Sequence, residues 1–221
     1  MTVGPATTTL TMDPSPFMWI LGQPNPAISV FISPVQGSVT YVQLQSSNPA
    51  VVQVPSIVQI PANTASASFT PTTVSTGTAT ITASITPVPA PGEVGAAAAA
   101  LATTDAVTVF TVTRSPADMT ILAGHTGTVT LTLSNPLPVS LPGVTAGGGA
   151  ITNGLVSVPT PITIPAGVTS YDITVTALQP SATTRTLWFQ MPTTVSDVPG
   201  LQLTATAITV NPLEFELAIA S

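Results

Sequence analysis

The residues of this chain that could carry chemistry are few and lie far apart. His125 is the sole histidine, and its setting in GHTG (residues 124–127) predicts a surface turn before a strand. A Ser-His-Asp triad or an HExxH zinc helix would need this one residue. We therefore expect no catalytic residues and predict that the protein is not an enzyme.

The eight carboxylates are dispersed and do not follow DxD or EF-hand spacing. A calcium site that gathers oxygens from distant loops, for instance Asp105 with Asp118 or with Asp197, stays an alternative at this point. The spacing favours no metal. The carboxylates are Asp13, Glu93, Asp105, Asp118, Asp172, Asp197, Glu214 and Glu216.

The glycine run at residues 147–149, with Gly154 beyond it, superficially resembles a phosphate-binding loop. No lysine follows it and no helical pattern opens there, so a bound anion would lack both a counter-charge and a helix dipole. We interpret the run as a flexible loop and expect no cofactor. Arg114 and Arg185 are the only bases, and a net charge of −6 excludes nucleic acid as a partner.

The composition is typical of an exposed protein with very few charges. Charged residues make up 5% of the 221, prolines number 24 and cysteine is missing, so stability must come from packing. The apolar runs are far shorter than the roughly 20 residues that span a bilayer, so we expect no membrane partner. The N-terminal segment lacks the features of a signal peptide, which predicts synthesis in the cytoplasm.

Alternation of apolar and polar residues with a period of two predicts an all-β fold. In GTVTLTLSN (residues 127–135), Val129 and Leu131 point to one face of a strand and Thr130 to the other. Many short strands separated by frequent turns are typical of β-sandwiches. Similar runs cover residues 39–44, 79–85, 107–112, 171–175 and 205–210.

An internal repeat divides the chain into two copies. Residues 52–70, VQVPSIVQIPANTASASFT, align without a gap on residues 156–174, VSVPTPITIPAGVTSYDIT, with eight of nineteen positions identical. Further along, residues 79–81 correspond to residues 187–189. The spacing between the copies is that of about one Ig-like domain.

The residues before the repeat also match. Gly37, Val42, Leu44 and Ser47-Asn48-Pro49 correspond to Gly124, Val129, Leu131 and Ser134-Asn135-Pro136. This match predicts an insertion of about seventeen residues between Leu137 and Leu155 in the second copy.

The two copies resemble the bacterial Ig-like (Big-type) repeats found in bacterial surface proteins and bacteriophage virion proteins. The resemblance rests on SNPA (residues 47–50), on VPSIVQIPANTASASFT, on TGTATITAS (residues 76–84) and on their second copy. It implies two tandem Ig-like β-sandwich domains that serve spacing, display and adhesion, with no catalytic residue to carry over. We place the domains at residues 28–113 and 114–212, between an N-terminal arm (1–27) and a C-terminal tail (213–221).

The arm is the segment that we expect to dock on a partner. A proline-flanked arm has no core of its own, so its apolar cluster must pack on something else, either a partner or the first domain of the same chain. The predicted docking residues are Phe17, Met18, Trp19, Ile20 and Leu21.

Three smaller expectations complete the layout. Residues 87–104 are predicted to form a long loop, and the alternating tail is predicted to form an extra edge strand. Trp188 and Phe189 are adjacent, so they must face opposite sides of a strand, and we place Trp188 in the core.

These observations favour a non-enzymatic structural protein of a bacteriophage virion, most simply a capsid decoration protein that displays Ig-like domains. The expected partners are the major capsid protein or other virion proteins, together with further copies of the chain in an oligomer or lattice. A host-surface glycan stays open as a partner. The alternatives are a bacterial cell-surface or adhesin module and a carbohydrate-binding accessory domain, for which aromatic residues at 5% are few.

Overall fold

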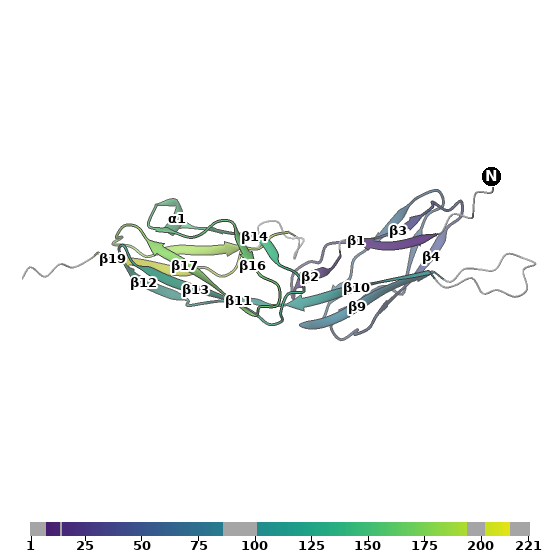
Figure 1. Ribbon diagram of the computed structural model, residues 1–221, viewed down its shortest axis with the longest axis horizontal. Helices are drawn as coiled ribbons and strands as arrows, with labels where there is room; N and C mark the ends of the chain where they lie inside the picture. The colour runs from purple at the N-terminus through teal and green to yellow at the C-terminus, as the bar shows by residue number, and fades with distance from the viewer. Residues whose placement is uncertain (1–7, 14, 86–100, 194–201, 213–221) are drawn as a thin grey trace, which may run out of the picture. The chain divides into compact units, whose positions relative to one another are not determined.

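The computed structural model describes residues 8–13, 15–85, 101–193 and 202–212. These residues form an all-β protein with one short helix, and the chain divides into two compact units, Met1–Phe110 and Thr111–Ser221 (Figure 1). The predictions of an all-β fold and of two β domains are confirmed. Within the described ranges, no helix is long and apolar enough to cross a membrane.

The described part of the first unit contains ten strands in two larger sheets and one two-stranded ribbon. The strand orders are β1-β3-β7 and β2-β10-β9-β4-β6, and β5 pairs with β8. The strands are β1 (Thr9–Asp13), β2 (Phe17–Ile20), β3 (Ile28–Ser33), β4 (Thr40–Ser46), β5 (Val52–Gln53), β6 (Ile57–Ile60), β7 (Ser66–Phe69), β8 (Thr72–Thr73), β9 (Gly77–Ile85) and β10 (Leu101–Phe110).

One hydrophobic core joins the two larger sheets of this unit. Val30 of β3 comes from the three-stranded sheet, whereas Val42 of β4 and Ile81 of β9 come from the five-stranded sheet, and all three are fully buried. Strand periodicity turns alternate residues inward, so each sheet offers one apolar face to the other. Burying one such side chain contributes about 1.5–3 kcal/mol to folding.

The second unit repeats this plan. Its sheets have the orders β11-β13-β17-β15 and β12-β19-β18-β14-β16, and Leu131, Val175 and Phe189 are fully buried between strands of both. Its elements are β11 (Val112–Ser115), β12 (Asp118–Leu122), β13 (Thr126–Leu133), β14 (Leu141–Gly147), α1 (Gly149–Thr152), β15 (Val156–Ser157), β16 (Ile162–Ile164), β17 (Ser170–Ala177), β18 (Arg185–Gln190) and β19 (Thr206–Asn211).

The strand orders of the two units agree except at β5 and β15, since β5 pairs with β8 in the first unit and β15 pairs with β17 in the second. The repeat at residues 52–70 and 156–174 is confirmed. β5 and β15 begin at the first aligned pair, Val52 and Val156, and β7 and β17 begin at Ser66 and Ser170. In each unit the second strand pairs in parallel with the last, β2 with β10 and β12 with β19.

The match of the residues before the repeat is wrong. Val42 and Leu44 lie on β4, whose counterpart is β14, whereas Val129 and Leu131 lie on β13, the counterpart of β3. All four side chains are buried, as alternation predicted, but they occupy non-equivalent strands. The predicted insertion therefore contains β14, a regular strand of the repeat.

The structure also corrects the predicted arm at residues 1–27. β1 pairs with β3 in antiparallel fashion, and β2 pairs with β10 in parallel. The segment therefore supplies strands to both sheets of the first unit, as β11 and β12 do in the second. It belongs to the domain that it was expected to precede.

Two further predictions fall partly or wholly outside the described residues. Of the predicted loop at residues 87–104, residues 101–104 belong to β10 and the remainder are not described. The tail at residues 213–221 also lies outside the described residues.

Candidate functional site

The five predicted docking residues lie in or next to strand β2. Phe17 and Trp19 are each 1% exposed, and their rings stack with centroids 5.4 Å apart at an interplanar angle of 20°. The register sets them opposite Val107 and Val109 of β10, so they fill the core beside the last strand.

The other three residues are not presented to solvent either. Met18 and Ile20 point to the opposite face of β2 and are buried, and Leu21 packs partly buried against the core. The structure therefore corrects the docking prediction. In an isolated arm this cluster would be open to a partner. In the structure the cluster packs within the first unit, because β2 pairs with β10.

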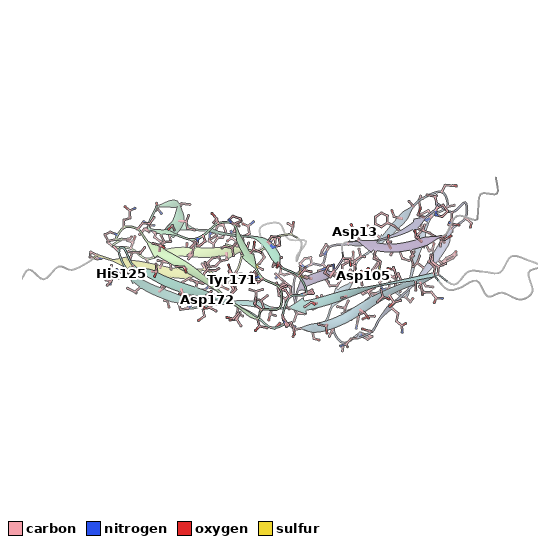
Figure 2. All side chains as sticks on the ribbon, viewed as in Figure 1. Asp13, Asp105, His125, Tyr171 and Asp172 are labelled. Atoms are coloured by element: carbon pink, nitrogen blue, oxygen red, sulfur yellow. The ribbon has the colours of Figure 1, made fainter. Side chains whose placement is uncertain are left out.

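His125 lies in the turn between β12 and β13, as predicted, and is exposed (Figure 2). Its backbone N–H donates to the Leu122 carbonyl at 3.0 Å, and ring atom Nδ1 lies 3.3 Å from the Ala123 carbonyl oxygen. Its ring contact is therefore with the backbone of its own turn.

Two carboxylates accept hydrogen bonds from hydroxyl groups. Asp105 of β10 accepts a hydrogen bond from the Ser15 hydroxyl. Asp172 of β17 accepts one from the Thr130 hydroxyl of β13 at 2.6 Å. Within the described parts of the chain, no three acidic or histidine side chains gather closely enough to hold a metal ion. Four of the carboxylates lie outside those parts: Glu93, Asp197, Glu214 and Glu216.

Arg114 is used to join strands. Its guanidinium donates to the carbonyl oxygens of Thr204 and Ala205, just before β19, and to that of Pro116 at 2.6 Å. These bonds tie β11 to the neighbourhood of β19, which lies in the other sheet of the second unit.

The glycine run makes room for Trp188. Gly147 ends β14, and a Cβ atom there would lie 2.4 Å from the Trp188 ring, while Gly148 has φ +107°. Gly149 begins helix α1. The prediction that this run forms a flexible loop with no helix is therefore wrong. The core placement of Trp188 is also wrong, because Phe189 is the fully buried neighbour and Trp188 is half-buried on the outer face.

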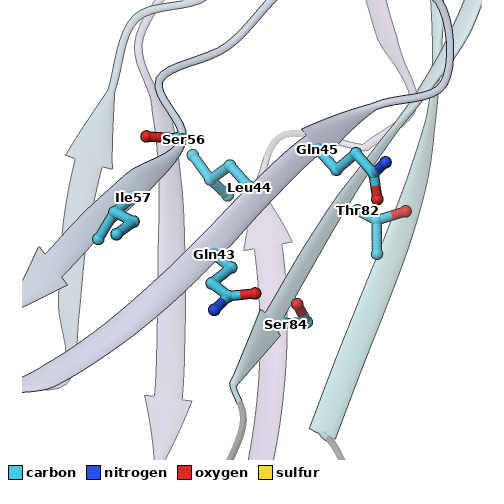
Figure 3. Close-up of a pocket in the computed structure, with 7 residues that line it drawn as sticks. All are labelled: Gln43, Leu44, Gln45, Ser56, Ile57, Thr82 and Ser84. Carbon is cyan, nitrogen blue, oxygen red and sulfur yellow. The ribbon is translucent and has the colours of Figure 1, made fainter.

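A shallow groove on the outer face of the five-stranded sheet is a candidate site in the first unit (Figure 3). Gln43 of β4 lies opposite Ser84 of β9, and Gln45 lies opposite Thr82, so amides and hydroxyls alternate across the two strands. The lining residues are Gln43, Leu44, Gln45, Ser56, Ile57, Thr82 and Ser84.

Sequence reasoning missed this groove. Alternation indicated that Gln43 and Gln45 point outward, but only the pairing of β4 with β9 brings them beside Ser84 and Thr82. The lining offers hydrogen-bond donors and acceptors and contains no ionisable group. Such a surface can bind a polar ligand but cannot transfer a proton at neutral pH.

No protein-family model matches the chain, and a search of curated proteins finds no significant sequence similarity. The function is therefore proposed from the composition, the duplicated fold and the groove.

Proposed function

We propose that this chain is a non-enzymatic structural protein of a bacteriophage virion, which decorates or stabilises the capsid with two tandem Ig-like β-sandwich domains. The observation that carries the proposal is the duplication of one β domain, whose strand order differs between the copies only at β5 and β15. The resemblance to bacterial Ig-like repeats implies a role in spacing and display, whereas an activity would require a constellation of reactive side chains.

Two features support the Ig-like assignment of each domain. Two mainly antiparallel sheets enclose one core in the first unit, and strands of both sheets supply the buried residues of the second. In each unit the chain crosses after its first strand to the other sheet. There the second strand pairs in parallel with the last strand of the same unit, β2 with β10 and β12 with β19. These features agree with the sequence resemblance to bacterial Ig-like repeats.

The composition supports a role in a protein lattice. The chain has only two arginines, no lysine and eight carboxylates among 221 residues. Most surfaces can therefore be buried against a capsid without removing charges from water, which is costly. The proposed partners are the major capsid protein, other virion proteins and further copies of this chain. The proposed location is the virion.

Mass spectrometry of density-purified particles from the source of this sequence tests the proposal. We expect the chain in fixed stoichiometry with the major capsid protein. Purified chain added to particles that lack it should still bind in about 1 M NaCl, where the screening length is about 3 Å, because the contacts are mostly uncharged. Recovery of the chain from the envelope of uninfected bacteria, and not from particles, would identify a bacterial surface module instead.

A further inference from the structure

We infer that the outer face of the five-stranded sheet in the first unit binds a neutral oligosaccharide. We call this surface the glutamine face. The assignment does not rest on the virion proposal, because it concerns the ligand of one exposed surface. The face consists of Tyr41, Gln43 and Gln45 of β4, Gln59 of β6, and Thr82 and Ser84 of β9.

The sheet geometry brings these side chains together. On β4, Val42 and Leu44 point into the core, so Tyr41, Gln43 and Gln45 point outward and are exposed. The register adds a neighbour to each: Gln59 opposite Tyr41, Ser84 opposite Gln43 and Thr82 opposite Gln45. The polar side chains form one row on each of the three adjacent strands β6, β4 and β9. Neighbouring rows lie about 4.8 Å apart, which is the spacing of strands in a sheet.

The chemistry of the rows matches sugar hydroxyls. An amide both donates and accepts hydrogen bonds, as a sugar hydroxyl does. Three of the nine glutamines of the chain stand on this face. The Gln43 and Gln45 side chains make no hydrogen bond to another described residue, so both amides are open to a ligand.

Apolar groups flank the amides. Tyr41 is 56% exposed, which leaves its ring free to pack against the C–H face of a sugar ring. Ile57, opposite Gln43 on β6, is 50% exposed and lines the groove. An aromatic ring and an aliphatic side chain beside amides suit a ligand that alternates apolar faces with hydroxyls.

Charge decides which oligosaccharides fit. Both arginines of the chain lie in the second unit, so an acidic sugar would find no cation in the first. The nearby carboxylate, Asp105 of β10, pairs with the core residue Ile81 and bonds to Ser15, which directs it away from the glutamine face. The ligand is therefore uncharged.

A protein partner fits the face less well. The centres of protein interfaces are enriched in aromatic side chains, methionine and arginine. The centre of this face holds amides and hydroxyls, with its single aromatic ring on β4 towards one end. A second copy of the chain is nevertheless a measurable alternative.

Titration of the full chain with neutral oligosaccharides, followed by NMR, tests the inference. The probes are maltohexaose, cellohexaose, mannohexaose and chitohexaose, with oligogalacturonate as the acidic contrast. We expect saturable shifts confined to β4, β6 and β9 with at least one neutral probe and none with the acidic probe. If no neutral probe shifts these strands, or if the shifts map elsewhere, the inference is wrong.

Three variants sharpen the result. Tyr41→Ala, and separately Gln43→Ala combined with Gln45→Ala, should each weaken binding about tenfold, equivalent to about 1.4 kcal/mol. Phe31→Ala is the matched control, since Phe31 is a 38% exposed aromatic on β3 of the other sheet, and it should leave the affinity unchanged. Thermal melts check that each variant folds.

Two results would overturn the assignment. Equal weakening by Phe31→Ala would mean that the ligand does not use this face. Concentration-dependent dimers in analytical ultracentrifugation that Tyr41→Ala abolishes would identify a second copy as the occupant. Because sugar binding is measured on the isolated chain, its failure leaves incorporation into particles untouched.

Discussion

The five-stranded sheets of the two units have the same strand order but differ on their outer faces. In the first unit this face is open and carries the paired Gln43 and Ser84 of β4 and β9. On the equivalent strands of the second unit, Trp188 of β18 lies opposite Gly147 of β14, and its ring covers that glycine. The core plan is thus shared while the outer face has diverged, and the proposed sugar-binding surface belongs to the first unit alone.

The parallel strand shows a second difference, inside the core. Phe17 and Trp19 of β2 stack as an aromatic pair, whereas the equivalent residues of β12 are Met119 and Ile121. A Cβ atom on Gly127 would lie 2.6 Å from the Met119 sulfur, so a glycine of β13 makes room for this pair. The same strand is therefore filled by different volumes in the two units.

Removal of the first two strands should give the largest difference in stability between the two units. A chain that begins at Ala27 lacks β1 and β2, including the buried Phe17 and Trp19. We expect the first unit to unfold, because the loss of one such aromatic alone costs about 3–5 kcal/mol. Calorimetry should show only the transition of the second unit, and hydrogen exchange should assign it. Two retained transitions would contradict the correction of the arm.

Strand phase in the second unit can be tested at β13. Leu131→Ala should cost about 2–5 kcal/mol, because it leaves a cavity at a fully buried position. Thr130→Ala should cost about 1 kcal/mol or less, since it removes one exposed hydrogen bond to Asp172. Urea melts measure both values. Equal costs would mean that the strand phase is off by one residue.

The filled outer face of the second unit depends on Gly147. Gly147→Ala should destabilise that unit by about 1–3 kcal/mol, because the added methyl group meets the Trp188 ring. Gly37→Ala is the control in the first unit, where a Cβ atom meets nothing within 4 Å, and it should change stability by about 0.5 kcal/mol or less. Tryptophan fluorescence and thermal melts read out both. A neutral Gly147→Ala would remove this contrast between the units.

His125→Ala is expected to have the smallest effect. The side chain is exposed in a turn, so its loss should change stability by about 0.5 kcal/mol or less. Incorporation into particles and sugar binding should be unchanged. A more than tenfold loss of any measured activity would overturn the non-enzymatic proposal.

Sequence reasoning succeeded where the signal is local. Alternation determined the inward phase of Val42, Leu44, Val129 and Leu131, and the gapless repeat located equivalent strand starts at Val52 and Val156. These results need only the period of a strand and a similarity between two segments.

The same reasoning failed where the pairing of a strand depends on segments far away in the sequence. Strands of alternating valine, leucine and threonine look alike, so β4 was matched to β13, although pairing partners distinguish them. β2 acquires its place from β10, which lies about ninety residues later. The inward choice of Phe189 over Trp188 likewise depends on how β18 meets its neighbours.

The parallel pairs β2–β10 and β12–β19 have a mechanical consequence. We expect the first strand of each unit to detach early under tension. The second and last strands run parallel, so pulling on the two ends of a unit applies a shear force along this pair. All hydrogen bonds of such a pair are loaded together and must break together. Single-molecule pulling should therefore give two separate ruptures, one per unit, and smooth extension without ruptures would contradict this geometry. Each unit is therefore expected to resist tension applied between its second and last strands.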